Sequence, residues 1–285
     1  MNFEHIQSFI YLMALSIIFV ACSGNNDQQN DSYTDAMSHE HHGETPTATG
    51  ITFSTPSEPV ASENIYYGND DEFSGYFAQP MEVDSNAPAV ILIHEWWGLN
   101  ENIQTMTEIL AGEGYRVLAV DFYDGQVAQN SDESQQFMRA AMQEEDKHYR
   151  NLSAASAFLR NEGAPKVAIM GWCFGGAWTL NGAINLSSEF DAGVIYYGRV
   201  NSDPDQLSQI EIPLLGIFGA EDRGIPVEGV REFERVLLDL DKEIELYIFD
   251  DADHAFANPS GARYNEEAAK DAWAKTLEFL NRNLR

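Results

Sequence analysis

Positive charge is the feature that this sequence lacks most. Its 285 residues include 16 Lys and Arg against 46 Asp and Glu, for a formal net charge of −30 at pH 7, and the first basic residue is Arg116. Nucleic-acid binding depends on basic side chains that neutralise phosphates, and anionic membranes repel an acidic surface. We therefore expect no nucleic-acid partner and no attraction of the folded domain to a membrane surface.

Cysteine is also scarce. The only two, Cys22 and Cys173, have such different sequence contexts that we expect no disulfide between them. Cys22 ends an apolar run over residues 9–21, which has the length of the hydrophobic region of a signal peptide and is short for a membrane span. This run resembles the end of a bacterial lipoprotein signal, with Val20, Ala21 and Cys22 as the end of a lipobox.

That resemblance implies a signal segment over residues 1–22 and a lipid on Cys22. It also implies a protein anchored in the bacterial cell envelope, on the periplasmic side or in the outer membrane, whose membrane contact is made only through the lipidated N-terminus. Phe19 stands where leucine is usual, and residues 1–8 contain no Lys or Arg. An uncleaved hydrophobic anchor and a buried helix are the alternatives.

Residues 23–63 are rich in Asn, Asp, Gln, Ser, Thr and Pro, a composition that buries too little apolar surface to fold. We interpret them as a flexible tether before a single domain over residues 64–285. The tract His39, Glu40, His41 and His42 could bind a transition metal weakly, because neutral imidazole is a good ligand. The composition favours the other interpretation, a solvated polar tract.

Strand-like and helix-like segments alternate from residue 64 onward. Continuous apolar runs such as residues 89–93 are typical of strands that are covered on both faces. The alternation predicts an α/β fold with a mostly parallel, doubly wound sheet flanked by helices. Strands are expected over residues 64–67, 73–79, 89–93, 115–120, 166–170, 192–197, 213–219 and 243–249, and helices over residues 100–112, 131–161 with one break, 174–186, 227–240 and 265–284.

The sequence Gly-Trp-Cys-Phe-Gly-Gly over residues 171–176 lies between a predicted strand and a predicted helix. A Gly-x-nucleophile-x-Gly turn at such a junction presents one side chain at the top of a sheet. Here that side chain is Cys173, whose thiolate would be stabilised by the helix N-terminus and a nearby imidazolium. An inert buried cysteine is the alternative.

Two later strands supply the partners that such a nucleophile needs. Asp222 and His254 each follow a predicted strand, in the chain order nucleophile, acid, histidine. Functional side chains in open α/β sheets gather beyond the carboxyl ends of the strands. We therefore expect His254 to exchange a proton with Cys173 while Asp222 fixes its tautomer. Asp251 and Asp253 are interpreted as solvated turn residues.

Together these motifs resemble the dienelactone hydrolase family of the α/β-hydrolase superfamily, over most of residues 64–285. The resemblance implies an α/β-hydrolase fold and an oxyanion hole made by the backbone N–H groups of Trp96 and Phe174. It also implies that Glu95 holds the resting nucleophile away from the histidine until substrate binds, although Glu95 could instead cap the helix that starts near Asn100. The resemblance rests on residues 94–100, 121–123, 171–176, 196–198 and 253–256.

The sequence departs from that family where the substrate is held. Family members that act on dienelactone bind its carboxylate with two arginines, and the matching positions here are Gly125 and Asn258, which cannot form a charged clamp. Arg199 and Arg223 lie on the predicted rim and could receive an anion instead, although Arg223 could simply pair with Glu221. Further substrate-binding candidates are the aromatic residues Trp97, Tyr197 and Phe256.

We therefore expect a hydrolase of small esters or lactones that uses Cys173, His254 and Asp222 and requires no metal or organic cofactor. The alternatives are a non-catalytic ligand-binding module on the same fold, a peptidase, and a redox sensor built on Cys173. A pure binder has no need of three matched polar groups, and the sensor would lack a resolving cysteine.

Overall fold

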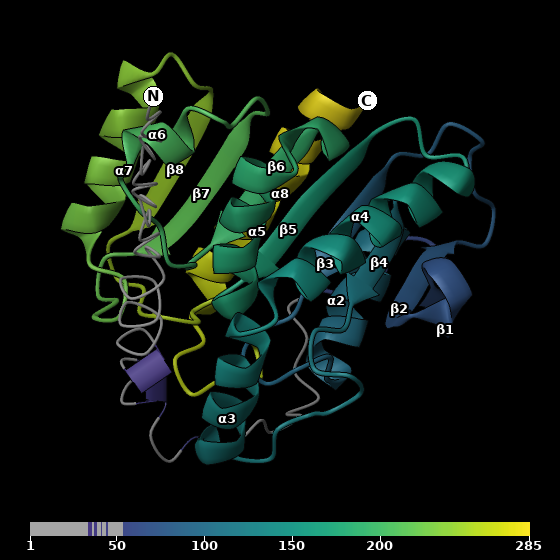
Figure 1. Ribbon diagram of the computed structural model, residues 1–285, viewed down its shortest axis with the longest axis horizontal. Coiled ribbons are helices and arrows are strands. Elements are labelled where there is room, and N and C mark those ends of the chain that lie inside the picture. Colours follow the sequence, from purple (N-terminus) through teal and green to yellow (C-terminus); the bar gives the residue numbers. More distant parts are fainter. Residues whose placement is uncertain (1–33, 36, 39–40, 42–43, 45–53) are drawn as a thin grey trace, which may run out of the picture.

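An eight-stranded sheet forms the centre of the computed structural model, which describes residues 34, 35, 37, 38, 41, 44 and 54–285 (Figure 1). The strands are β1 (Val60–Tyr67), β2 (Phe73–Pro80), β3 (Ala89–Ile93), β4 (Arg116–Val120), β5 (Val167–Trp172), β6 (Ala192–Tyr196), β7 (Leu214–Gly219) and β8 (Ile244–Phe249). Their order across the sheet is β1-β2-β4-β3-β5-β6-β7-β8.

Parallel pairing extends from β4 across to β8, whereas β1 pairs antiparallel with β2, and β2 pairs antiparallel with β4. All residues of β3, β4, β5, β6 and β7 are buried. This burial explains the continuous apolar runs, because a strand with helices on both faces has no solvated side. The predicted fold class, a mostly parallel sheet flanked by helices, is confirmed.

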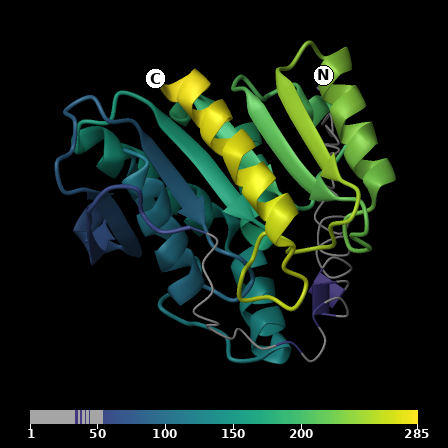
Figure 2. The same ribbon diagram turned by 180° about the vertical axis from the view of Figure 1, so that it is seen from behind.

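Helices cover both faces of the sheet. The helices α4 (Glu145–Asn161) and α5 (Phe174–Asn185) lie on the face seen in Figure 1, and α8 (Glu266–Leu284) crosses the opposite face in Figure 2. The other elements are α2 (Glu101–Gly112), α3 (Ser131–Met142), α6 (Pro204–Leu207), α7 (Val227–Asp239) and the short 3-10 helices η1 (Asn69–Asp71) and η2 (Ser187–Glu189).

Asparagine side chains fix the starts of three helices. The side chains of Asn100, Asn130 and Asn265 accept hydrogen bonds from backbone N–H groups in the first turns of α2, α3 and α8. Each bond satisfies a donor that the helix itself cannot pair. The sequence predicted that Asn100 and Asn265 are the first residues of two helices. They are instead the N-caps, and α2 and α8 each begin one residue later.

The short helix α6 was not predicted from the sequence. Asp203 accepts a hydrogen bond from the backbone N–H of Asp205 at 2.9 Å, and Pro204 occupies the first turn. Four residues are too few to show the periodicity that identifies longer helices. The predicted break in the stretch over residues 131–161 is real, because α3 ends at Met142 and α4 begins at Glu145.

The predicted tether boundary at residue 63 is wrong, because β1 begins at Val60 and pairs with β2 along its full length. The described residues nearer the N-terminus also differ from a solvated tether. Thr34, Met37 and His41 are buried. His41 therefore contradicts the interpretation of its tract as solvated, whereas His39, Glu40 and His42 lie outside the described residues.

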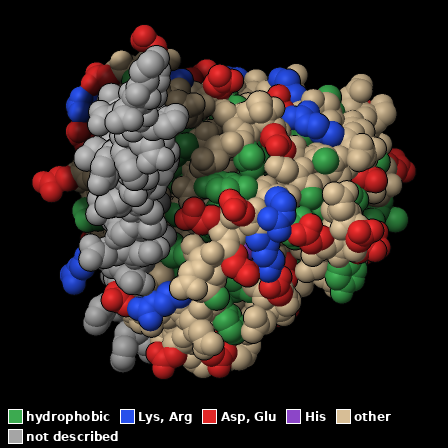
Figure 3. Space-filling view, viewed as in Figure 1, with side chains coloured by type: hydrophobic (Ala, Val, Ile, Leu, Met, Phe, Trp, Pro, Cys, Tyr) green, Lys and Arg blue, Asp and Glu red, His purple; other side chains and the backbone are tan. Residues whose placement is uncertain are grey.

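The predicted signal segment over residues 1–22, with Cys22, also lies outside the described residues, and the lipid anchor stays a prediction. Within the described part of the chain, no helix is both long and apolar enough to cross a membrane. Asp and Glu side chains are scattered over the face shown in Figure 3, as the net charge of −30 leads one to expect.

Candidate active site

Cys173 occupies the sharp turn between β5 and α5. Its backbone has φ 55° and ψ −116°, a region that L-residues rarely adopt. The surrounding glycines are needed because a Cβ on Gly175 would lie 2.2 Å from the carbonyl oxygen of Ile93, and one on Gly171 would lie 2.4 Å from the backbone of Gly175. The N-terminus of α5 is thereby pressed against the end of β3, and the first turn of any helix carries N–H groups that the helix itself cannot pair.

Asp222 and His254 form a buried pair in the loops after β7 and β8. Nδ1 of His254 lies 2.7 Å from Oδ2 of Asp222, and both side chains are 0% exposed. Asp222 also accepts a hydrogen bond from the backbone N–H of Ile225 at 2.8 Å. With one oxygen held by the backbone and the other on the ring, the carboxylate fixes the orientation of His254 and leaves Nε2 directed away from it.

The protonation of this pair follows from its contacts. Burial alone would raise the pKa of Asp222, but the charge of His254 and its hydrogen bond outweigh burial and lower that pKa. Burial alone would lower the pKa of His254, but the charges of Cys173 and Asp222 raise it well above its usual value. These contacts favour the protonated form of the His254 ring.

The thiol of Cys173 is close to that ring. Its side chain is almost fully buried, and its sulfur and a ring nitrogen of His254 lie within 4.8 Å of each other. Burial alone would raise the pKa of Cys173, but the charge and hydrogen-bonding of His254, helped by His41, lower it to about 6. The arrangement is that of a thiolate and imidazolium pair, the reactive form of a cysteine nucleophile.

Glu95 lies beside the thiol on the loop after β3. Oε1 accepts a hydrogen bond from the hydroxyl of Tyr197 at 3.4 Å, and Oε2 accepts a short one from the side-chain amide of Asn258. Burial, followed by the negative charge of Cys173, raises the pKa of Glu95 to about 7. Glu95 does not cap α2, because Asn100 does so with its own side chain.

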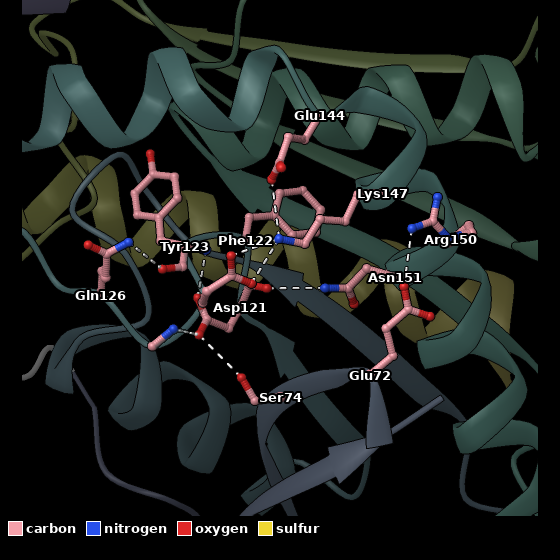
Figure 4. A network of polar contacts seen from close by, with 12 residues as sticks. Glu72, Ser74, Asp121, Phe122, Tyr123, Gln126, Glu144, Lys147, Arg150 and Asn151 are labelled. Carbon is pink, nitrogen blue, oxygen red and sulfur yellow. Dashed lines mark hydrogen bonds and ion pairs between the residues drawn. The ribbon is translucent and has the colours of Figure 1, made fainter. Parts of the chain in front are cut away.

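A network of polar contacts surrounds Asp121 at the end of β4 (Figure 4). Asp121 accepts hydrogen bonds from the backbone N–H groups of Tyr123, at 2.8 Å, and of Gly125, and its own carbonyl accepts one from the amide of Asn151 at 3.1 Å. The buried ring of His94 accepts from the backbone N–H of Phe122 at 3.1 Å. These contacts position backbone and leave Asp121 with a structural role.

The predicted substrate-binding residues divide into two groups. Arg199 is half-buried and Arg223 is exposed. The aromatic candidates Trp97, Tyr197 and Phe256 are buried, and the ring of Phe256 packs on that of Tyr197 with centroids 5.6 Å apart. The space beside Glu95, Trp172, Tyr197 and Asn258 amounts to about 10 Å³, which is about the space that one water molecule needs.

Sequence reasoning missed two residues of this site. Asn258 was identified only as a missing arginine, whereas it holds the carboxylate of Glu95. His41 was assigned to a polar tract, whereas its ring packs on Trp96 with centroids 4.5 Å apart and lies 5.3 Å from the ring of His254. The one available signal was the cluster of histidines in a segment otherwise poor in functional side chains.

Comparisons with known proteins identify a family and related sequences. Residues 73–284 match the family described as "Dienelactone hydrolase family". A "Putative carboxymethylenebutenolidase" of Saccharolobus solfataricus is 30% identical over 260 residues, which cover 77% of this chain and 98% of that protein. A protein of the same name from Salmonella typhimurium is 29% identical over 224 residues, which cover 74% of this chain and 83% of that protein.

Solved structures show the same fold. The crystal structure of a "Putative Dienelactone Hydrolase" from Klebsiella pneumoniae superposes on this chain with a TM-score of 0.72 at 25% sequence identity. The superposition covers 79% of this chain and 100% of that one.

Proposed function

Because this chain belongs to the dienelactone hydrolase family and is a hydrolase of carboxylic ester or lactone bonds, we propose that Cys173 is its nucleophile, His254 its acid and base, and Asp222 the residue that orients His254. The observation that carries the proposal is the buried set of sulfur, imidazole and carboxylate at the carboxyl edge of the sheet. Burial strengthens each charge interaction, because little water screens it.

In the proposed reaction, the thiolate of Cys173 attacks the carbonyl carbon, and the carbonyl oxygen becomes an oxyanion. The backbone N–H groups of Phe174 and Trp96 are proposed to bind this oxyanion, because the first turn of α5 and the loop after β3 adjoin the sulfur. His254 donates its proton to the departing oxygen, the C–O bond breaks, and a thioester remains. His254 then accepts a proton from water, which hydrolyses the thioester and frees the sulfur.

Glu95 is proposed to restrain the resting thiolate. A second negative charge beside a carboxylate is unfavourable, so ionisation of Glu95 and of Cys173 oppose each other. Tyr197 and Asn258 hold Glu95 at this position, and a substrate that displaces either contact would release the restraint.

The proposed substrate is a neutral ester or lactone and not a carboxylate-bearing one. Gly125 offers no side chain, and Asn258 already donates to Glu95, so neither position supplies a positive charge for an anion. The buried aromatic side chains of Trp97 and Phe256 suit an apolar acyl group instead.

The first experiment measures turnover of p-nitrophenyl acetate and of a panel of lactones by the full chain, in EDTA, for wild type, Cys173→Ala and the matched control Cys22→Ala. Cys173→Ala should lower kcat by about 10⁴-fold or more, whereas Cys22→Ala should leave it unchanged. Mass spectrometry should detect an acyl group on Cys173 during turnover. Equal turnover by Cys173→Ala and wild type would refute the proposed nucleophile.

We also propose that Cys22 carries a lipid that anchors the protein in the bacterial cell envelope. The support is the sequence of residues 9–22 alone. Incorporation of labelled palmitate in a bacterial host, and its loss in Cys22→Ala, would test the anchor. A labelled Cys22→Ala variant would contradict it.

A further inference from the structure

The described residues of the N-terminal region lie over the proposed active site. We refer to residues 34, 35, 37, 38, 41 and 44 as the covering segment. Its contacts with the domain include ion pairs between Arg139 and Asp35, at 2.5 Å, and between Arg263 and Glu44, at 3.2 Å. Met37 is fully buried and packs against Gly224. A Cβ added to Gly224 would lie only 2.5 Å from Cε of Met37. The segment therefore reaches the loop that carries Asp222.

His41 is the residue of this segment that approaches the chemistry. Ligand atoms of His41, Cys173 and His254 all lie within 4.8 Å of one another, and all three residues are buried. The ring of His41 is only 2% exposed, and its Nε2 has no hydrogen-bond partner among the described residues. Nε2 of His254 is likewise buried without one. Apart from the sulfur of Cys173, with which both rings interact, these two buried nitrogens face no polar partner among the described residues.

The second ring nitrogen of each histidine contacts a carboxylate. Nδ1 of His254 lies 2.7 Å from Asp222, and Nδ1 of His41 lies 2.7 Å from Oε2 of Glu44, with Nη2 of Arg263 also 2.8 Å away. Metal-bound histidines in proteins commonly donate this second N–H to a carboxylate, which fixes the tautomer and leaves the other nitrogen free to bind the metal. His254 therefore has the support that a metal ligand requires, and His41 has it in the tautomer whose Nδ1–H donates to Glu44.

One thiolate and two imidazoles form a ligand set that suits Zn²⁺ and other thiophilic divalent ions. Zn–S and Zn–N bonds of roughly 2.3 and 2.0 Å place one sulfur and two nitrogens about 3.3–3.5 Å apart, so the three ligand atoms, which lie within 4.8 Å of one another, have to approach by at most about 1.5 Å. Three protein ligands would leave the fourth position of the metal open.

We propose that Cys173, His254 and His41 form a binding site for a thiophilic divalent ion such as Zn²⁺, and that the bound ion holds the covering segment over the nucleophile and blocks turnover. On binding, the ion displaces the proton of Nε2 of His254 into solvent and takes the lone pairs of Nε2 and of the sulfur, so neither is available to a substrate. The inhibition depends on the function proposed above, whereas metal binding does not.

The binding experiment uses Co²⁺ as a spectroscopic probe with the full chain after removal of metals. Wild type should bind one Co²⁺ with a thiolate-to-metal charge-transfer band, and Cys173→Ala should lose that band. His41→Gln should bind Co²⁺ at least about 100-fold more weakly, because loss of a ligand costs more than the 10–100-fold typical of a lost outer-shell partner. Glu44→Gln should weaken binding less, because it removes only the support of His41. The matched control, with both His39→Gln and His42→Gln, should bind like wild type.

Equal Co²⁺ affinity in wild type and His41→Gln, or the lack of a thiolate band in wild type, would overturn the proposal. A loss of affinity in the control as large as in His41→Gln would also overturn it, because the histidine tract would then bind metal without the thiol.

The inhibition experiment measures ester turnover against Zn²⁺ concentration. Zn²⁺ should inhibit wild type at a concentration at least about tenfold below that needed for His41→Gln, and EDTA should restore activity. Equal inhibition of the two proteins would contradict the role of the covering segment. If wild type in EDTA hydrolyses no ester, the proposed function fails, and the Co²⁺ titration still decides whether the metal site exists.

Discussion

The carboxyl ends of the parallel strands leave about 10 Å³ beside Glu95, whereas the opposite end of the sheet carries a groove of about 1160 Å³. The groove is lined by residues such as Met81, Asp84 and Lys166, with no cysteine or histidine among its lining residues. The carboxyl ends of the strands carry the thiol of Cys173, whose pKa is lowered, and the buried imidazole of His254, whose pKa is raised. In this chain, side-chain chemistry locates the candidate site, and the size of a cavity does not.

The largest expected difference between the two ends is catalytic. Asp222→Asn should lower kcat by about 10⁴-fold, because an amide favours the wrong tautomer of His254. Asp84→Asn, which makes the same change at an exposed residue of the groove, should leave kcat within about twofold of wild type, because surface changes away from the site act weakly. Steady-state kinetics on an activated ester measure both. A similar loss of kcat in the two variants would show that the carboxyl ends of the strands are no more important for turnover than the groove.

Backbone packing should show the next largest difference. A Cβ on Gly175 would meet backbone atoms of β3 at 2.2 Å, so Gly175→Ala should destabilise the fold by about 3 kcal/mol. Gly229, in α7, has no atom within 4 Å of an added Cβ. Gly229→Ala should therefore stabilise the protein by about 0.5–1 kcal/mol. Urea unfolding measures both changes in stability. An unchanged free energy of unfolding in Gly175→Ala would show that the turn between β5 and α5 has room for a methyl group.

Low pH should destabilise the fold at the carboxyl ends of the strands. His148 is buried there against Phe122, with ring centroids 4.2 Å apart. Burial, helped by the charge of Lys147, lowers the pKa of His148 to about 4. The folded pKa lies below the unfolded value of about 6.5, so the contribution to stability is complete above pH 6.5 and is lost as the pH falls towards 4.

The size of that loss is measurable by urea unfolding at pH 7 and pH 5. Wild type should lose about 2 kcal/mol more than His148→Leu between these values, because only the wild-type histidine takes up a proton on unfolding. The comparison between variants cancels the contributions of the other titrating groups. Parallel pH profiles of the two proteins would show that His148 keeps an ordinary pKa.

The smallest expected effect concerns Glu95. Glu95 carries its negative charge only near and above its pKa of about 7, so Glu95→Gln should lower the pKa of Cys173 and accelerate alkylation by iodoacetamide at pH 7, in EDTA. The increase should be about twofold or less, and it should vanish at pH 5.5, where Glu95 is protonated. Glu82→Gln, at the groove, serves as the matched control and should leave the rate unchanged. An identical alkylation rate in all three proteins at pH 7 would remove the restraining role of Glu95.

Local patterns account for the parts of this molecule that the sequence predicted correctly. Apolar runs identified the buried strands, and the glycines around Cys173 identified the strained turn, because both depend on neighbouring residues. The chain order of Cys173, Asp222 and His254 anticipated their convergence, since each follows a parallel strand.

Contacts between distant segments could not be predicted in this way. Asn258 binds Glu95 across 163 positions, and no periodicity connects the two. His41 lies in a stretch whose composition is typical of disorder, yet it is buried against Trp96. Such contacts arise from the shape and charge of the folded site, which composition does not encode.

The position of β8 has a consequence for the newborn chain. Cys173 is synthesised well before His254, which follows β8, so the imidazole proposed to activate the sulfur can reach it only after β8 docks beside β7. Until then the thiol keeps its solution pKa of roughly 8.5 and reacts slowly with electrophiles and oxidants. On the proposed mechanism, a nascent chain that still lacks β8 therefore carries this thiol without the imidazole that would activate it.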